Sequence, residues 1–389
     1  MSSGLDLEDL CTDFSIPEHV RSFEHAPGTR VRFGPGVLDS IGNEGAALGK
    51  RAMIVTDEGL VEAGYVGRAV RALTTAGLEV TVFSSVHENP TTADVRATVG
   101  AAKDAKIDLL IGLGGGSSMD CAKGCNFILT NGGEMKDYWG KEKATKPMLP
   151  LIAVPTTAGT GSECQSFALI ADEHTHAKMA CGDKKAAARV ALLDPELTLS
   201  QPSNVTAVTA IDAISHAVES YVCKSANNIS RSYALAAFQL MQDATERITA
   251  DPKNLLGRAR MQLGAAMAGT AIENSMLGAA HSMANPLTAH FDIIHGQAVG
   301  VALPAVIRRN SQDAEVAALY RELLSSQPLD AWITTQVANQ GLATCLSDLN
   351  VSREMLHQLA KEASTQWTAQ FNPIGLTADD FEQLYQSCY

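Results

Sequence analysis

The chain has 389 residues, of which 46% are hydrophobic and 5% aromatic, and its formal net charge is −13. This length supplies enough apolar side chains for two packed cores, so we expect two domains. The negative charge argues against nucleic acid and anionic membranes as partners, and no apolar run approaches the roughly 18 residues needed to span a bilayer.

The first residues, MSSGLDLEDLCTDF, lack the basic and apolar segments of a secretory signal, and the eight cysteines are scattered without a CxxC pattern. Such cysteines are typical of reduced thiols in an intracellular protein, so we expect a cytoplasmic location. The sequence leaves the role of the N-terminal tail open.

Strand and helix patterns alternate through the first half of the chain. Short apolar runs predict buried strands at 51–59, 78–86, 107–116, 150–163 and 189–198. Helical spacing of apolar residues predicts helices at 60–77, 91–106 and 117–131. We expect Gly77 to end the first helix and Thr91 to cap the second. The alternation is typical of an α/β domain built on a doubly wound, mostly parallel sheet.

The sequence pattern changes after Pro202. Long stretches rich in alanine and leucine dominate from there to the C-terminus, with few strand signals. We therefore predict an α/β dinucleotide-binding domain over residues 1–200 and an all-helical domain over 201–389.

Glycines gather where the predicted strand 107–116 meets the next helix, in the stretch GLGGGSSMD that begins at Gly112. Glycines at such a junction let backbone N–H groups converge on an anion, and the helix N-terminus adds positive potential. The stretch therefore suits a bound pyrophosphate, although its order differs from GxGxxG. A tight turn without a ligand is the alternative.

Polar residues also follow two other predicted strands. Asp57 closes the first strand, where an acid can bond an adenosine ribose and repel a 2′-phosphate, so it favours NAD over NADP. The alternative is that Asp57 only caps the next helix. Thr156, Thr157 and Thr160 follow a later strand and could reach the nicotinamide side of a cofactor, or could simply cap their own loop.

Two segments of the second half carry metal-ligand residue types. Asp212 and His216 are four residues apart in a helical stretch, so they share one helix face. The segment 279–298 adds His281, His290 and His295. One carboxylate with two or three imidazoles suits Fe(II), Zn(II), Mn(II), Co(II) or Ni(II). An Asp–His hydrogen bond without metal is the alternative for the first pair.

Taken together, these motifs resemble the iron-containing (group III) alcohol dehydrogenase family over nearly the whole chain. The matching motifs are RVRFGPGVLDSIG, GGGSSMDCAKG, PTTAGTGSE, DPELT, DAISHAVE, HSMANPLTAHFDIIHGQA and FNPIGLTADDFEQLY. The resemblance implies a dehydroquinate-synthase-like architecture with the site between the two domains. It also implies hydride transfer between NAD(H) and a short-chain alcohol, aldehyde, diol or hydroxyaldehyde, one divalent metal, usually Fe(II), and a homodimer or higher oligomer.

The family's functional residues fall on defined positions of this sequence. The implied metal ligands are Asp212, His216, His281 and His295. The implied cofactor contacts are Asp57, Asn89, Gly115, Gly116, Ser117, Ser118, Met119, Asp120, Thr156, Thr157, Thr160 and Lys178.

The chain departs from much of the family at Asn285, where many members have a histidine credited with proton movement. An amide cannot shuttle a proton at neutral pH, so either water carries the proton, or His290 replaces the missing group, or no relay is needed. We favour a structural role for His290. Gln165 and Phe167 follow the threonine loop and are candidates for the substrate pocket.

Two other reactions fit parts of this pattern. A hydroxyacid–oxoacid transhydrogenase would keep NAD bound between two half-reactions. A dehydroquinate-synthase-like lyase would need a strongly basic pocket, and the segments around the predicted ligands contain few lysines and arginines.

Overall fold

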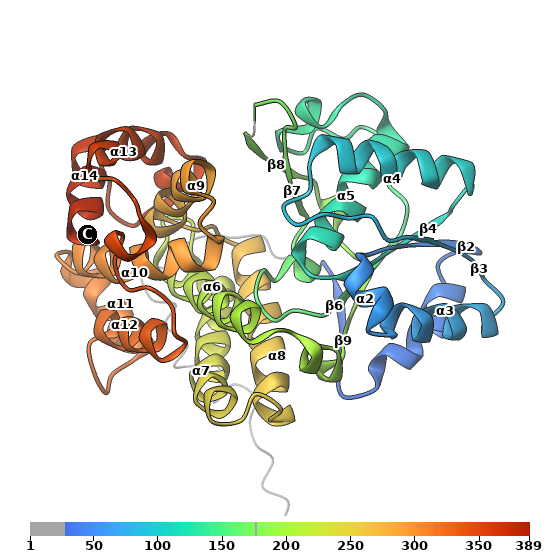
Figure 1. Ribbon diagram of the computed structural model, residues 1–389, viewed down its shortest axis with the longest axis horizontal. Helices are drawn as coiled ribbons and strands as arrows, with labels where there is room; N and C mark the ends of the chain where they lie inside the picture. The colour runs from blue at the N-terminus through green and yellow to red at the C-terminus, as the bar shows by residue number, and fades with distance from the viewer. Residues whose placement is uncertain (1–27, 176) are drawn as a thin grey trace, which may run out of the picture.

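A computed structural model describes residues 28–175 and 177–389 of the protein. Figure 1 shows a first part made of a sheet covered by helices and a second part made of helices, which lie side by side. The N-terminal tail considered above lies outside the described residues.

A six-stranded parallel sheet forms the centre of the first part. In spatial order its strands are β1 (Arg30–Phe33), β9 (Val190–Leu193), β6 (Leu151–Pro155), β4 (Leu109–Gly114), β2 (Arg51–Val55) and β3 (Glu79–Phe83). The chain passes from β2 outward to β3 and then returns to β4 on the other side of β2. The order therefore reverses between β2 and β4, which is where open sheets of this kind bind ligands, outside the carboxyl ends of the strands.

Helices cover both faces of this sheet because successive strand residues point to opposite sides. Met53 and Val55 of β2 pack in one core, whereas Ala52 and Ile54 pack in the other. The first core includes α4 (Thr92–Asp104) and α5 (Gly116–Asn131). The second includes α1 (Ile41–Ala46) and α3 (Tyr65–Thr75). The predicted fold class, a doubly wound parallel sheet followed by a helical region, is confirmed.

The helix predicted over 60–77 is wrong as a single element. The structure has α2 (Glu58–Glu62) and then α3, with Gly64 between them in a left-handed conformation at φ 83°. Glycine adopts this conformation without the steric cost that a side chain imposes, so it ends one helix and starts the next. Gly77, at φ 88°, follows the end of α3 as predicted, and Thr91 caps α4 in a capping box with Asp94.

A second, three-stranded sheet was not predicted. It consists of β5 (Gly140–Lys141), β8 (Lys178–Gly182) and β7 (Phe167–Ala171), and β7 pairs with β8 in antiparallel register. Its strands are short, and β5 pairs with a segment about forty residues away. Local sequence patterns do not indicate pairing between strands so far apart in the chain.

All regular elements that the structure describes beyond Leu193 are helices. The α-helices are α6 (Ser203–Val222), α7 (Asn228–Ala250), α8 (Leu255–Glu273), α9 (Ala279–Phe291), α10 (His295–Asn310), α11 (Ala314–Leu323), α12 (Leu329–Asn339), α13 (Leu356–Thr365) and α14 (Ala378–Ser387). Helix α6 is buried nearly all round and packs against α7, α8 and α10. No helix within the described ranges has the length and apolarity to cross a bilayer.

The loop after β6 packs backbone to backbone against α8. A Cβ atom added at Gly269 would lie 2.3 Å from the carbonyl oxygen of Gly161, and Gly161 itself has φ 63°. Gln262, also on α8, donates from Nε2 to the carbonyl oxygens of Pro155 and Asp194, 3.2 and 3.3 Å away. The sheet and the helical part are therefore joined by contacts that leave no room for a side chain.

We predict that Gly269→Ala destabilises the protein by about 1–3 kcal/mol or more, because its methyl group would overlap a backbone carbonyl. Gly100→Ala is the matched control, since Gly100 lies in α4 and an added Cβ would meet no atom within 4 Å apart from its own chain neighbours and helix backbone. The control should stabilise by about 0.5–1 kcal/mol through helix propensity. Urea unfolding measures both, and a Gly269→Ala protein as stable as the parent would contradict the close contact.

Candidate metal and dinucleotide site

The sequence-predicted cofactor residues lie at the carboxyl ends of neighbouring strands. Asp57 follows β2, Asn89 follows β3, the glycine turn follows β4, and the three threonines follow β6. Strand β4 pairs with β2 on one side and with β6 on the other. These strand ends therefore meet at one edge of the sheet, beside the point where the strand order reverses.

The glycine turn leads directly into α5. Gly115 is the N-cap residue and makes no side-chain cap, so the first N–H groups of this 16-residue helix remain available to an anion. Gly114 has φ 153°, and a Cβ there would lie 2.4 Å from Oγ of Ser118. A Cβ at Gly116 would lie 2.8 Å from Cγ2 of Thr160. The glycines are thus needed for close approach of the turn to its surroundings.

The other residues of the turn differ in exposure. Ser117 accepts a hydrogen bond at Oγ from the backbone N–H of Asn89, 3.3 Å away, and so joins the ends of β3 and β4. Ser118 and Met119 are each 1% exposed and pack beneath the turn. Their side chains support the glycine backbone from inside the protein.

Asp57 caps α2, as the alternative interpretation held. Its Oδ1 accepts a hydrogen bond from the backbone N–H of Leu60 at 3.1 Å. The cap uses one carboxylate oxygen and leaves the charge at the end of β2. Capping and ribose binding are therefore compatible at this position.

A buried lysine holds the threonine loop against α5. Lys123 is 0% exposed and donates from Nζ to the backbone oxygen and Oγ of Ser162, at 2.6 and 2.8 Å, and to the backbone oxygen of Phe167 at 2.9 Å. Ser162 in turn donates to Oδ1 of Asp120 at 2.7 Å. A cation, a hydroxyl and a carboxylate thus form a closed network, which fixes the loop over the glycine turn.

Three imidazoles surround one carboxylate oxygen in the helical part. Asp212 and His216 come from α6, His281 from α9 and His295 from the start of α10. The Nε2 atoms of His216, His281 and His295 lie 3.4, 3.7 and 3.9 Å from Oδ1 of Asp212. The structure therefore brings together all four residues that the family resemblance assigned to a metal.

This cluster fits a divalent metal. Oδ1 of Asp212 and Nε2 of His281 are buried without a hydrogen-bond partner, which is costly unless another group satisfies them. Ligand atoms 2.0–2.2 Å from a metal in a tetrahedral site are about 3.3–3.6 Å apart, close to the separations seen here. The ligand atoms of Asp212, His216 and His281 all lie within 4.8 Å of one another.

The electrostatics of the cluster also suit a cation. Burial lowers the pKa of His216 and lowers that of His295 to about 3, which keeps both imidazoles neutral. Burial also disfavours a charge on His281, but Glu219 and Asp212 outweigh it and raise its pKa to about 9. Burial acts to raise the pKa of the Asp212 carboxyl, yet the imidazoles, His216 foremost, lower it below its usual value. Asp212 is therefore the anionic centre of the set.

The cluster and the sheet edge are connected. Gly159, in the loop after β6, packs against Thr209 of α6, and its backbone interacts with His216. Lys178 on β8 is accessible, yet nearby protein atoms lower its pKa by desolvation while Asp120 and Asp212 act in the opposite direction. Because the carboxylates of Asp120 and Asp212 both act on it, Lys178 lies near the glycine-turn helix and near the cluster.

Asn285 and His290 occupy different faces of α9. Asn285 is one helical turn beyond His281 on the same face, and its Nδ2 donates to Oε1 of Gln366 at 3.0 Å. His290 is nine residues beyond His281, which corresponds to about 13.5 Å along the axis and the opposite face. Its Nε2 lies 2.8 Å from Oε2 of Glu362 on α13. The structure thus places His290 in a helix–helix contact.

The two substrate-pocket candidates make structural contacts. Gln165 donates from Nε2 to the carbonyl oxygen of Thr160 at 2.8 Å and so braces the threonine loop. Phe167 packs against Trp367 with ring centroids 5.9 Å apart, and Lys141 lies over both rings. Trp367 begins a short 3₁₀ helix, η8 (Trp367–Phe371), whose Thr368 hydrogen-bonds Ser282 at 2.7 Å. This aromatic contact therefore joins β7 to the helical part next to His281.

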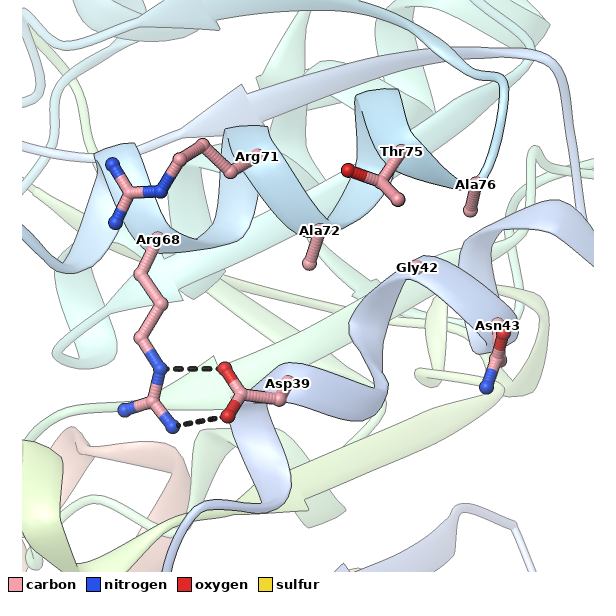
Figure 2. Close-up of a pocket in the computed structure, with 8 residues that line it drawn as sticks. All are labelled: Asp39, Gly42, Asn43, Arg68, Arg71, Ala72, Thr75 and Ala76. Atoms are coloured by element: carbon pink, nitrogen blue, oxygen red, sulfur yellow. Dashed lines mark hydrogen bonds and ion pairs between the residues drawn. The ribbon is translucent and has the colours of Figure 1, made fainter.

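A separate hollow lies between α1 and α3, which cover one face of the sheet. Figure 2 shows Arg68 pointing into it and bonding Asp39 through two hydrogen bonds of 2.6 and 2.9 Å. The guanidinium of Arg68 is thus engaged by a protein carboxylate. In Figure 1, α3 is remote from α9, so this hollow is distinct from the candidate site.

Sequence reasoning missed two buried charged residues of the site. Glu219 contacts His281, and its signal was available, because Asp212, His216 and Glu219 follow the i, i+4, i+7 spacing of one helix face. Lys123 lies in the stretch that follows the glycines, but no local pattern indicates that its side chain is buried. The burial of Lys123 is explained only by the position of the loop at Ser162, whose oxygens accept from its Nζ.

Comparisons with known proteins give one family for both parts of the chain. Residues 28–195 match the family described as iron-containing alcohol dehydrogenase, and residues 206–389 match the C-terminal region of the Fe-containing alcohol dehydrogenase family. The chain therefore belongs to the iron-containing alcohol dehydrogenase family, and it is an oxidoreductase that acts on alcohols.

Individual relatives cover nearly the whole chain. The chain is 32% identical to the NAD-dependent methanol dehydrogenase of Bacillus methanolicus over 91% of this chain and 96% of that protein. It is 33% identical to 1,3-propanediol dehydrogenase of Klebsiella pneumoniae over 95% and 99%. Among solved structures, a 1,3-propanediol oxidoreductase matches with TM-score 0.90 and 31% identity, and an alcohol dehydrogenase from Oenococcus oeni with 0.91 and 30%; both matches cover 95% of this chain and 100% of the other.

Proposed function

We propose that the protein is a metal- and NAD-dependent dehydrogenase that interconverts a short-chain alcohol or diol and the corresponding aldehyde. The observation that carries this proposal is the convergence of Asp212, His216, His281 and His295 on helices that the loop after β6 joins to the glycine turn at the switch point of the sheet. The names of the relatives support it, because they include an NAD-dependent methanol dehydrogenase and 1,3-propanediol dehydrogenases.

We assign each group of residues a role. Asp212, His216, His281 and His295 would hold the metal, and the N–H groups at Gly115, Gly116 and Ser117 would bind the pyrophosphate. Asp57 and Asn89 would contact the adenosine side, and Thr156, Thr157 and Thr160 the nicotinamide side. Asp120 would contact the cofactor beside the glycine turn, and Lys178 would approach the ribose or the phosphates. Ser118 and Met119, being buried, would act by supporting the turn.

When bound, the metal supplies Lewis acidity toward the alcohol oxygen and the nicotinamide is the hydride acceptor. The chain's own contribution is orientation: the network around Lys123 fixes the threonine loop, and the packing of Gly159 against Thr209 holds that loop on α6, the helix that carries Asp212 and His216. Holding two reactants in a fixed arrangement lowers the entropic cost of reaching the transition state. Asn285 has no titratable proton at neutral pH, so water would carry the proton away.

Several finer features belong to this proposal. We favour Fe(II) because of the family, although the nitrogen and oxygen ligands also suit Zn(II), Mn(II), Co(II) and Ni(II). We also propose a cytoplasmic homodimer or higher oligomer, and a division into a dinucleotide-binding domain over 1–200 and a metal-binding domain over 201–389. A screen of short alcohols and diols with NAD and NADP, on Fe(II)-reconstituted protein, tests the reaction and identifies the preferred substrate.

A hydroxyacid–oxoacid transhydrogenase is the alternative within the family. It would exchange hydride between two substrates without releasing NAD, so its activity would not depend on added cofactor. Membership of an alcohol dehydrogenase family argues against the dehydroquinate-synthase-like lyase.

The ligand assignment is tested by His281→Ala. We expect this variant to lose most of its bound metal and its activity together, because one of four ligands is removed. Metal analysis after Fe(II) reconstitution and a turnover assay measure the two losses. His357→Ala is the matched control, since His357 also pairs with a glutamate, Glu382, but on the surface. Metal content equal to that of the parent would refute the assignment.

Cofactor preference is tested at Asp57. We predict higher catalytic efficiency with NAD than with NADP by about ten- to hundredfold, or about 1–3 kcal/mol, because a 2′-phosphate would meet the Asp57 carboxylate. Asp57→Gly should narrow the gap, and glycine at an N-cap costs only a few tenths of a kcal/mol relative to aspartate. Glu58→Ala removes a neighbouring exposed charge and should leave the preference unchanged. Better efficiency with NADP in the parent protein would overturn this prediction.

The proton route is tested at Asn285 and His290. We expect Asn285→His to raise turnover by less than about tenfold, or about 1.4 kcal/mol of barrier, because water already provides a route. We expect His290→Ala to keep metal, NAD binding and most activity, since His290 faces Glu362. A hundredfold gain in the first variant would contradict the water route. Loss of activity in the second, with both ligands still bound, would make His290 the acid–base group.

A further inference from the structure

Glu219 is a buried carboxylate that contacts both the side chain and the backbone around His281. It lies on α6 with 4% exposure, and its Oε2 is 2.5 Å from Nδ1 of His281. Its other oxygen, Oε1, accepts a hydrogen bond from the backbone N–H of Ala280 at 2.7 Å. One carboxylate thus bonds two neighbouring positions of α9.

These contacts also provide the N-terminal cap of α9. Gly278, the N-cap residue, has no side chain to offer, and the N–H groups of Ala279 and Ala280 are bonded by Asn372 and Glu219 instead. A Cβ at Gly278 would lie 3.0 Å from Oε1 of Glu219 and 3.1 Å from Oδ1 of Asn372. Carboxylates at helix N-termini are stabilising, so a glutamate side chain suits this capping position.

The same contact determines which ring nitrogen of His281 faces the cluster. An ionised carboxylate can only accept hydrogen bonds, so Nδ1 of His281 carries the hydrogen in this pair. The other nitrogen, Nε2, is buried without a partner and lies 3.7 Å from Oδ1 of Asp212. Orientation of the ring by Glu219 therefore directs Nε2 at the metal position.

We propose that Glu219 is a positioning residue of the metal site: it holds the backbone of α9 and the ring of His281 so that Nε2 is presented as a ligand. The inference rests on the proposed metal site and gives a role to Glu219, which ends the motif DAISHAVE and to which the resemblance assigned none. A carboxylate behind a ligating histidine fixes its tautomer and raises its basicity, and loss of such a partner lowers metal affinity by about 10- to 100-fold.

Glu219→Gln tests the proposal with almost no change in shape. The amide oxygen can still accept from the N–H of Ala280, but the amide NH₂ group then faces Nδ1 of His281. Nδ1 must now accept, so the hydrogen moves to Nε2 and points into the cluster. We expect the affinity for Co(II), measured by chelator competition, to fall 10- to 100-fold, with an altered visible absorption of bound Co(II).

Nitrogen-15 NMR of histidine-labelled, metal-free protein, recorded above the His281 pKa of about 9 so that the ring is neutral, provides a readout that does not need metal. Nδ1 of His281, assigned by its loss in His281→Ala, should carry a hydrogen in the parent and none in Glu219→Gln. This readout separates the two proposals: a parent that bound no Co(II) would refute the metal site, while the NMR result would still test the contact with Glu219.

Glu362→Gln is the matched control, because it removes the carboxylate of the other His–Glu pair on α9, at His290. It should leave Co(II) affinity and the His281 signals unchanged. Urea unfolding of the metal-free proteins shows whether Glu219→Gln remains folded; if it does not, Glu219→Asp, which keeps the charge but shortens the reach, should lower Co(II) affinity at least tenfold. A folded Glu219→Gln protein with parental Co(II) affinity and a hydrogen still on Nδ1 would overturn the proposal.

Discussion

The buried charge of Asp212 is the constraint on which the rest of this molecule depends. Asp212 is 6% exposed as a residue, and an isolated charge in such a place costs several kcal/mol or more. The imidazoles of His216, His281 and His295 face it, and they come from three different helices. Helices α6, α9 and α10 must therefore meet at this point. The nearly complete burial of α6 follows from this central position.

The loop after β6 connects these helices to the sheet. Its Gly159 packs against α6, its Gly161 against Gly269 of α8, and its Ser162 against Asp120 and Lys123 of α5. Each contact involves backbone or a buried side chain, so the loop has little freedom to move alone. The glycine turn and the imidazole cluster are therefore held in one fixed relation, as a reaction between two bound molecules requires.

Some elements could be predicted from sequence because their signals are local. Strands β2 and β4 are short apolar runs, and α4 begins at a threonine that forms a capping box with Asp94. The break at Gly64 was missed because apolar spacing continues across it, although a glycine there can adopt φ 83°. The sheet formed by β5, β7 and β8 was missed because its strands are stabilised by distant partners.

By itself, the sequence determined the alternation of strands and helices, the glycine turn and the pairing of Asp212 with His216 on one helix face. Each depends on residues within one or two turns of each other, where backbone geometry fixes the distance. Only the tertiary structure decided that Glu219 contacts His281 across 62 positions of the chain, that Lys123 holds the loop at Ser162, and that His290 pairs with Glu362. These contacts depend on how whole helices pack, and packing is set by many side chains at once rather than by the spacing of any few.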